Sequence, residues 1–573
     1  MTNPNQQGRA DLAAWENGKP QNFFMSDVNL RAVLRRIMGN ERYEAFCPRL
    51  VTLGGQAATV LDQWAKVEDH LGNHPRLERY DGIGQRTEGI EFHPNHDKSG
   101  ALIWESGVLT LQAEPGHNVE QMALFYLIGH NGEGGHACSI ACTSGLIRAL
   151  QQVGSDDLQA KYLPPLLNPD YAHMQHGAQF LTEVQGGSDV GANALNAAQD
   201  SDGVWRLTGE KWFCSNINAH QFLVMARPDS APDGTRGLGV FLVPRTLDDG
   251  TVNAFHIRRL KDKLGTRTLA SAELDFTGAT AYPIGALDHG FKTTVEWVLN
   301  TSRLLNAVSC AGVMRRAHIE ASTYACNRRA FGQVIASFPL VQEAVADCLT
   351  EATAAVASGF ALAEMLDNIE LGRAGEDDKG VYRMLVNLNK YITSVRGSEV
   401  VHRAIEVLGG NGAIESFSIL PRLYRDMVVL ESWEGTHNVL CLQVMRDITR
   451  YSLHEPFSRW MNGLLESIQH EALQEARALV SAAATRTYTL LARVGALPQE
   501  SQQTHARRLA DAYVLPAQAA LLLCEAAWEL SQGLMTAKPD IAVYFINKHL
   551  RPGYDPLDDV DYQKRLTRLM AVV

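Results

Sequence analysis

The sequence lacks the charge balance and the apolar runs that mark several large classes of protein. Lys and Arg total 52 against 64 Asp and Glu, which gives a net charge of −12. A chain with this charge has no general attraction for nucleic-acid phosphates or anionic lipid, so nucleic acid is not expected as a partner. No apolar run approaches the roughly 20 residues that cross a bilayer, so no membrane span is predicted.

Disulfide and targeting patterns are also missing. The nine cysteines are scattered and include no Cys-x-x-Cys pair, which excludes a disulfide framework and fits a reducing compartment. Cys138 and Cys142 lie in a small-residue helical pattern and are predicted to fill the core. The polar segment 1–20 has no apolar stretch of the kind that a secretory signal contains. We expect a cytoplasmic protein, with an organelle matrix as the alternative.

The chain is too long for a single core, and the spacing of its apolar residues changes twice along it, from helical to β and back to helical. The pattern predicts a helical unit at 1–178, a β unit at 179–288, a helical bundle at 289–450 and an additional helical region at 451–573. Within the bundle, long helices are expected at about 290–326, 339–370 and 379–408. The Gly-, Pro- and His-rich stretch 80–100 is expected to be a loop or a small hairpin.

A segment with two histidines, 129–136, invites the hypothesis of a metal site. It contains four glycines, which favour a loop, whereas a zinc-binding histidine pair needs a formed helix. We therefore predict no metal site, and a loop that faces a ligand stays open as an interpretation.

One carboxylate is placed where a general base would be useful. In Trp433-Glu434-Gly435-Thr436, Thr436 is a good N-cap for the apolar helix that follows, so Glu434 is predicted to lie in a turn. An aromatic wall from Trp433 would desolvate the carboxylate and raise its pKa, and Gly435 would let the backbone approach a ligand. A solvated junction between a loop and a helix has the same local pattern.

The start of the β unit carries a second candidate site. Residues 180–190 combine adjacent glycines with the hydroxyls of Thr182 and Ser188, and residues 208–216 add Phe213 and Ser215. Close backbone, hydroxyls and aromatic rings suit a planar cofactor that lies against a strand. A turn and a strand with core aromatics is the alternative.

Taken together and in order, these and other motifs resemble the acyl-CoA dehydrogenase family over about residues 75–450. The motifs lie at 154–164, 182–189, 211–216, 264–267, 328–332, 407–412 and 433–436. The resemblance implies a multi-domain α+β fold: an N-terminal helical domain, a central β-barrel or sandwich, a C-terminal four-helix bundle and an extra C-terminal helical region.

The resemblance also implies roles for individual residues. Glu434 matches the base that removes the α-proton of an acyl-CoA thioester, after which hydride passes from Cβ to flavin N5 and a 2,3-enoyl-CoA forms. The residues that match the FAD site are Thr182, Ser188, Phe213, Ser215, Arg328, Phe331, Gly409, Gly410, Gly412 and Thr436. Arg328 and the glycine loop match positions that reach the FAD of a neighbouring subunit, so a homodimer or homotetramer is implied. An electron-transfer flavoprotein or a similar acceptor would reoxidise the flavin.

Departures from the family pattern point to its long AidB-like branch. Trp433 stands where many members have Tyr, Phe213 where many have Trp, and Glu406 where many have Gln. Two alternative functions follow from this placement: a DNA-associated protective flavoprotein with little dehydrogenase activity, and an acyl-CoA oxidase. Residues 451–573 carry nearly balanced charge, which argues against the DNA-associated function. The sequence does not distinguish the oxidase, because that depends on how O2 reaches the flavin.

Overall fold

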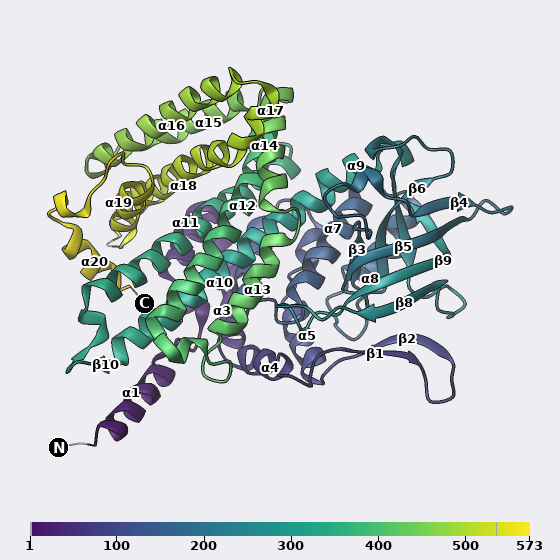
Figure 1. The fold of residues 1–573 in the computed structure, drawn as a ribbon, viewed down its shortest axis with the longest axis horizontal. Coiled ribbons are helices and arrows are strands. Elements are labelled where there is room, and N and C mark those ends of the chain that lie inside the picture. The colour runs from purple at the N-terminus through teal and green to yellow at the C-terminus, as the bar shows by residue number, and fades with distance from the viewer. Residues whose placement is uncertain (1–2, 535, 573) are drawn as a thin grey trace.

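A computed structural model describes residues 3–534 and 536–572, in which helices, strands and again helices follow one another (Figure 1). The N-terminal helices are α1 (Pro4–Gly18), α2 (Phe23–Ser26), α3 (Val28–Ala58), α4 (Val60–Glu68), α5 (Asn95–Glu105), α6 (Asn118–Gly129), α7 (Ala137–Val153) and α8 (Asp156–Leu166). A hairpin of β1 (Arg76–Tyr80) and β2 (Arg86–Glu91) precedes α5. The stretch predicted as a loop or hairpin therefore contains the second strand of this hairpin and the start of a helix.

Seven strands form the β unit. They are β3 (Gly177–Phe180), β4 (Asn196–Gln199), β5 (Trp205–Ser215), β6 (Gln221–Pro228), β7 (Gly239–Pro244), β8 (Phe255–Leu260) and β9 (Ser271–Pro283). Their pairings close a ring in the order β6–β7–β9–β5–β4–β6, with β3 added to β6 in parallel and β8 added to β9. The unit is thus a small closed barrel, and the predicted choice between barrel and sandwich is resolved.

Strands β6 and β7 are buried on both faces because they divide two cores. Phe222 and Val224 point into the barrel, whereas Leu223 between them joins the core of the helical regions. On β7, Phe241 faces the barrel in the same way. Successive side chains of a strand point to opposite faces, so a strand shared by two cores is apolar throughout. This shared wall fixes the barrel against the helices that carry the candidate base.

The bundle contains the longest helices. They are α9 (Gly290–Thr293), a π-helical turn at Thr294–Leu299, α10 (Asn300–Asn327), α11 (Pro339–Glu370), α12 (Glu376–Leu408), α13 (Leu420–Ser432) and α14 (His437–Tyr451). Pro339 begins α11 at the position that tolerates a missing N–H. The Asp378 carboxylate accepts a hydrogen bond from the Gly375 N–H and so supports the start of α12. Helix α10 is buried along nearly its whole length, between α6, α11, α12 and α13.

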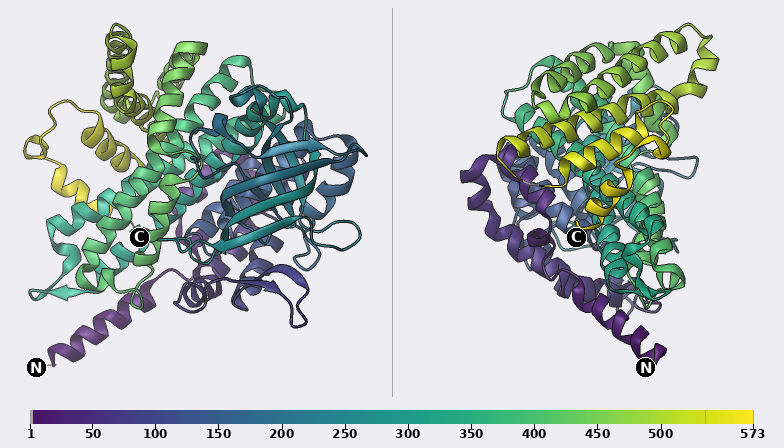
Figure 2. Two further views of the ribbon diagram at one scale, coloured as in Figure 1. Left: turned by 45° about the vertical axis from the view of Figure 1, so that its right-hand side comes forward. Right: turned by 90° about the vertical axis from the view of Figure 1, so that its left-hand side faces the viewer.

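The C-terminal helices lie on the side of the bundle away from the β unit (Figures 1 and 2). They are α15 (His454–Ser467), α16 (Gln474–Gly495), α17 (Gln499–Gln502), α18 (Ala506–Ser531), α19 (Lys538–His549) and α20 (Tyr562–Met570). Helix α18 packs on α11, α12 and α14, and the apolar side chains of both regions form one continuous core. The region therefore extends the bundle.

Two helical stretches reach the length and hydropathy of a membrane span, which the sequence analysis did not predict. They are Pro339–Glu370 and Gln499–Ser531. Of their most apolar windows, 94% and 78% are buried inside the fold. Both stretches therefore serve as core helices.

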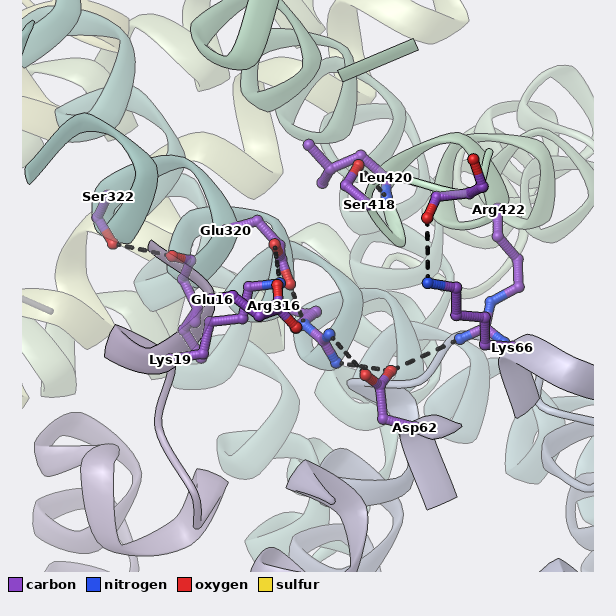
Figure 3. Close-up of polar contacts among 12 residues, drawn as sticks. Glu16, Lys19, Asp62, Lys66, Arg316, Glu320, Ser322, Ser418, Leu420 and Arg422 are labelled. Atoms are coloured by element: carbon purple, nitrogen blue, oxygen red, sulfur yellow. Dashed lines mark hydrogen bonds and ion pairs between the residues drawn. The ribbon is translucent and has the colours of Figure 1, made fainter. Parts of the chain in front are cut away.

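A buried ionic cluster ties the N-terminal helices to the bundle (Figure 3). The Arg316 guanidinium on α10 lies 3.1 Å from Asp62 Oδ1 and 2.9 Å from Glu320 Oε1. Lys19 of the N-terminal segment reaches Glu320 at 3.2 Å, and Arg422 on α13 lies 3.9 Å from Asp62. Burial by itself would raise the pKa of Asp62, but the Arg316 charge keeps that pKa below its ordinary value. Such a cluster is costly to break, because a removed partner leaves a buried charge uncompensated.

Candidate active site

Glu434 lies in a sharp turn between α13 and α14. Trp433 ends α13 in an extended conformation, and Glu434 then adopts a φ of 58° and Gly435 a φ of 105°. A left-handed conformation is uncommon for a residue with a Cβ and costs about 1 kcal/mol. Thr436 is the N-cap residue of α14, as predicted, but its hydroxyl makes no capping bond. The backbone strain therefore falls on Glu434, the residue whose carboxylate is the candidate base.

Two buried cations hold the backbone of this turn. Arg303 on α10 donates from Nε to the Glu434 carbonyl oxygen at 3.0 Å. Lys390 on α12 donates from Nζ to the carbonyl oxygens of Glu431 and Gly435 at 2.9 and 3.0 Å. Burial lowers the pKa of Arg303 to about 10 and that of Lys390 to about 8. These bonds offset the backbone strain at Glu434 and place two positive charges near its carboxylate.

The carboxylate itself is only partly satisfied. Its Oε1 accepts a hydrogen bond from Gln179 Nε2 at 3.3 Å, whereas Oε2 is buried with no hydrogen-bond partner among the described residues. Desolvation raises the pKa of Glu434 to about 7, and the charges of Arg303 and Lys390 limit that rise. A carboxylate with a pKa near neutrality and one free oxygen is suited to accept a proton from a bound molecule.

The role expected of Trp433 stays a prediction. Its indole is half-buried and packs against Cys138, Cys142 and Leu269. The Sγ atoms of Cys138 and Cys142 lie 3.8 Å apart without a disulfide, and both are buried as predicted for core residues. Trp433 therefore links the turn to α7 and to the loop before β9.

The hydroxyl and aromatic residues predicted for the flavin ring come together at the start of the barrel. Strands β3 and β5 meet where the Trp212 N–H donates to the Thr182 carbonyl oxygen at 2.9 Å. Next to Trp212, the Phe213 side chain is 49% exposed, and the Ser215 hydroxyl pairs with that of Ser271 at 2.9 Å. Ser188 is exposed in the loop that follows Thr182.

The second predicted group lies elsewhere in the chain. Arg328 precedes a short hairpin of β10 (Arg329–Ala330) and β11 (Gln333–Val334), at the end of the bundle far from the barrel (Figures 1 and 2). At its tip, Phe331 is 95% exposed and has a φ of 51°. A single chain thus does not bring Arg328 and Phe331 to Glu434.

In the glycine loop, Gly409–Ala413, two glycines border open space and one is packed against the chain. A Cβ on Gly409 or Gly410 would meet no described atom within 4 Å, so these two residues border open space. A Cβ on Gly412 would lie 2.5 Å from the Ile405 carbonyl oxygen. Internal packing therefore explains Gly412, and its predicted contact with a cofactor is not needed to account for the glycine.

The histidine-containing loop at 129–136 faces the interior. His130, Glu133 and His136 are buried, and the Glu133 N–H donates to Asp426 of α13 at 3.1 Å. Helix α13 covers the loop on this side, and the interpretation of a ligand-facing loop stays a prediction. In residues 3–534 and 536–572, no three His, Cys, Asp or Glu side chains are grouped as metal ligands.

Sequence reasoning missed three residues around the base, namely Gln179, Arg303 and Lys390. The signal for the two cations was a lone positive charge inside an otherwise uncharged helical stretch, at 302–305 and 388–392. Such a charge is rarely buried without a partner. Gln179 had no comparable signal, because a glutamine at a strand position is ordinary.

Family models match three successive segments between residues 15 and 449. The acyl-CoA dehydrogenase middle domain matches residues 178–279, and the acyl-CoA dehydrogenase C-terminal domain matches residues 288–449. The N-terminal domain of the adaptive response protein AidB matches residues 15–173. These limits follow the order of the helical, β and helical regions.

Individual relatives agree with these matches. AidB of Escherichia coli (strain K12) is 34% identical over 396 residues, which are 66% of this chain and 70% of that protein. Acyl-CoA dehydrogenase family member 11 of Caenorhabditis elegans is 30% identical over 443 residues, 74% of this chain and 70% of that protein. The crystal structure of Caenorhabditis elegans ACDH-11 in complex with C11-CoA superposes with a TM-score of 0.86 at 27% identity, covering 92% of this chain and 91% of that chain. The chain therefore belongs to the acyl-CoA dehydrogenase family, and within that family to the AidB-like branch.

Proposed function

We propose that the protein is an FAD-dependent acyl-CoA dehydrogenase that forms a 2,3-enoyl-CoA, with Glu434 as the base. The observation that carries this proposal is the state of the Glu434 carboxylate. It is buried in a strained turn, has a pKa of about 7, and keeps Oε2 without a partner in the described part of the protein.

The chemistry of the α-proton explains why such a base is needed. The α-proton of a thioester is far less acidic than a free carboxylic acid, so an ordinary Glu would be too weak a base. A pKa near 7 strengthens the base while leaving about half of it ionised at neutral pH. The rigid turn then matters, because Arg303 and Lys390 hold the backbone from which the carboxylate projects.

The same turn offers a donor for the negative charge that develops on the thioester oxygen. The Glu434 N–H donates to no other residue in the described ranges. The bonds to the carbonyl groups of Glu434 and Gly435 hold the turn in which this N–H lies. A preorganised backbone donor of this kind stabilises an enolate without reorganisation. Base and donor would then belong to one residue.

The residues at the start of the barrel fit FAD. When bound, FAD accepts the hydride from Cβ of the acyl group. A half-exposed ring at Phe213, the nearby Thr182, and the paired hydroxyls of Ser215 and Ser271 supply a flat face and polar contacts. A cavity of about 220 Å³ borders Ser271 and is also lined by Lys261, Lys263, Arg267 and Leu269. These residues would hold and orient the flavin ring.

The remaining predicted residues support a cofactor site shared between subunits. Phe331 is almost fully exposed on its hairpin, and Gly409 and Gly410 border open space. The exposed ring and the open space beside the two glycines leave room for contact with a second molecule. We propose that the hairpin and the glycine loop complete the FAD site of a second copy, in a homodimer or homotetramer.

The acyl-CoA class follows from the family, and one solved relative, ACDH-11, is in complex with C11-CoA. The acyl group that this chain prefers is left to experiment. The electron acceptor would be an electron-transfer flavoprotein or a similar protein. A DNA-associated function would need a basic surface, and the net charge of −12 does not favour it.

An anaerobic screen of acyl-CoAs tests the proposal. The purified protein should be yellow, and acyl-CoAs of varied length and branching should bleach its flavin band to different extents. Glu434→Gln should keep its FAD and lose the bleaching. If the variant is reduced at the normal rate, Glu434 is not the base; if no acyl-CoA bleaches the wild type, the proposed activity fails.

A further inference from the structure

The side chain of Gln179 joins the candidate base to the barrel. Gln179 lies in β3, where parallel pairing with Leu223 of β6 fixes its position. Its Nε2 donates to Glu434 Oε1 at 3.3 Å and to the Ser302 hydroxyl oxygen at 3.2 Å. The amide therefore bridges a strand of the barrel, helix α10 and the carboxylate.

The surroundings of this amide leave it little freedom. A Cβ on Gly145 of α7 would lie 3.3 Å from Gln179 Oε1 and 3.0 Å from Val298 Cγ1, so the amide packs closely over this glycine. An ionised carboxylate only accepts hydrogen bonds, so the NH2 group of the amide must be the end that faces Glu434. The charge of the base thereby sets the orientation of the amide.

Gln179 also relates the base to the flavin-ring residues. Thr182 follows it by three residues on the same chain segment, and Ser302 precedes Arg303, which holds the Glu434 carbonyl oxygen. The backbone of Glu434 is thus held from α10 and its carboxylate from β3. A shift of either element would move the base relative to the flavin segment.

We propose that Gln179 is a positioning residue that orients the Glu434 carboxylate and favours its ionised form. The inference rests on the proposed function, because it gives this carboxylate the role of base. A hydrogen bond to the charged form lowers a carboxyl pKa and so opposes the effect of burial. The other charged or titratable groups around the turn are Arg303 on α10, Lys390 on α12, Glu431 on α13 and His437 on α14. A substitution at Gln179 leaves all four in place.

The test is the pH dependence of flavin reduction by acyl-CoA in two variants. Gln179→Met keeps the approximate size and removes the donor, so the midpoint of the rate profile should move up by roughly half to one pH unit. Gln179→Glu places a second carboxyl group against the first, so its midpoint should move further in the same direction. Gln199→Met, the same change at the exposed end of β4, should match the wild type. A Gln179→Met profile that superposes on the wild type, or that falls equally at every pH, would overturn the proposal.

A second measurement does not need turnover. Infrared titration of the FAD-loaded protein should show a buried carboxyl band that Glu434→Gln removes. Its midpoint should rise in the order wild type, Gln179→Met, Gln179→Glu. If no acyl-CoA reduces the wild-type flavin, the dehydrogenase proposal fails, but this titration still decides the role of Gln179. An equal midpoint in all three proteins would refute it.

Discussion

Replacing Glu434 with Gln should stabilise the protein above neutral pH, because the buried carboxylate is costly to ionise. The pKa of Glu434 is raised from 4.5 to about 7. Between these two values the folded protein binds the proton more tightly than the unfolded chain does, so stability falls as the pH rises through this window. A difference of about 2.5 pKa units corresponds to about 3 kcal/mol of folding free energy. The wild type has lost this full amount of stability once the pH is above 7. Gln cannot ionise, so Glu434→Gln avoids this cost.

Thermal or denaturant unfolding of the FAD-loaded proteins from pH 4.5 to pH 8 measures the effect. Near pH 4.5, Glu434→Gln and the wild type should have about the same free energy of unfolding. At pH 8, Glu434→Gln should be more stable by up to about 3 kcal/mol. Glu376→Gln, an exposed change in the first turn of α12, serves as the control and should show no such trend. A difference between Glu434→Gln and the wild type that does not change with pH would refute a raised pKa at Glu434.

Three further substitutions test separate parts of the structure. Lys390→Met removes a positive charge near Glu434, so the pH midpoint of flavin reduction should rise by about one unit, and an unchanged midpoint would contradict the assigned electrostatics. Phe331→Ala alters an exposed side chain, so the free energy of unfolding should change by less than about 0.5 kcal/mol. The FAD-to-protein ratio, measured by absorbance, should fall. Full FAD retention would remove Phe331 from the cofactor site. Asp62→Ala leaves Arg316 without one partner and should destabilise the chain by about 3–5 kcal/mol in denaturant unfolding; wild-type stability would show that the cluster contributes nothing.

The course of the fold could be predicted because local signals marked it. The expected helix at 339–370 has Pro339 at its start and Gly372, with a positive φ, just after its end, and both residue types mark helix boundaries. Apolar runs of β6 and β7 predicted strands, but not that these strands divide two cores. That division depends on the helices packed behind them, which no local pattern describes. Two core helices have the hydropathy of membrane spans because other helices cover them on nearly all sides, and their sequence does not show what covers them.

The candidate site could be predicted only in part. Motif order pointed to Glu434, and the turn at Gly435 was expected. The positive φ at Glu434 had no local signal, because this conformation is uncommon for a residue with a Cβ. Gln179, Arg303 and Lys390 come from three elements that are distant in sequence and meet only in the folded chain. Their convergence is a tertiary property, so sequence spacing gave no access to it.

The most direct test of the central claim follows the α-proton itself. Anaerobic rapid mixing of the FAD-loaded protein with an acyl-CoA and with its 2,2-dideuterated form compares the rates of flavin reduction. We predict a slower rate with the deuterated acyl-CoA in the wild type and no reduction in Glu434→Gln. Equal rates for the two acyl-CoAs, together with normal reduction in Glu434→Gln, would contradict α-proton removal by Glu434.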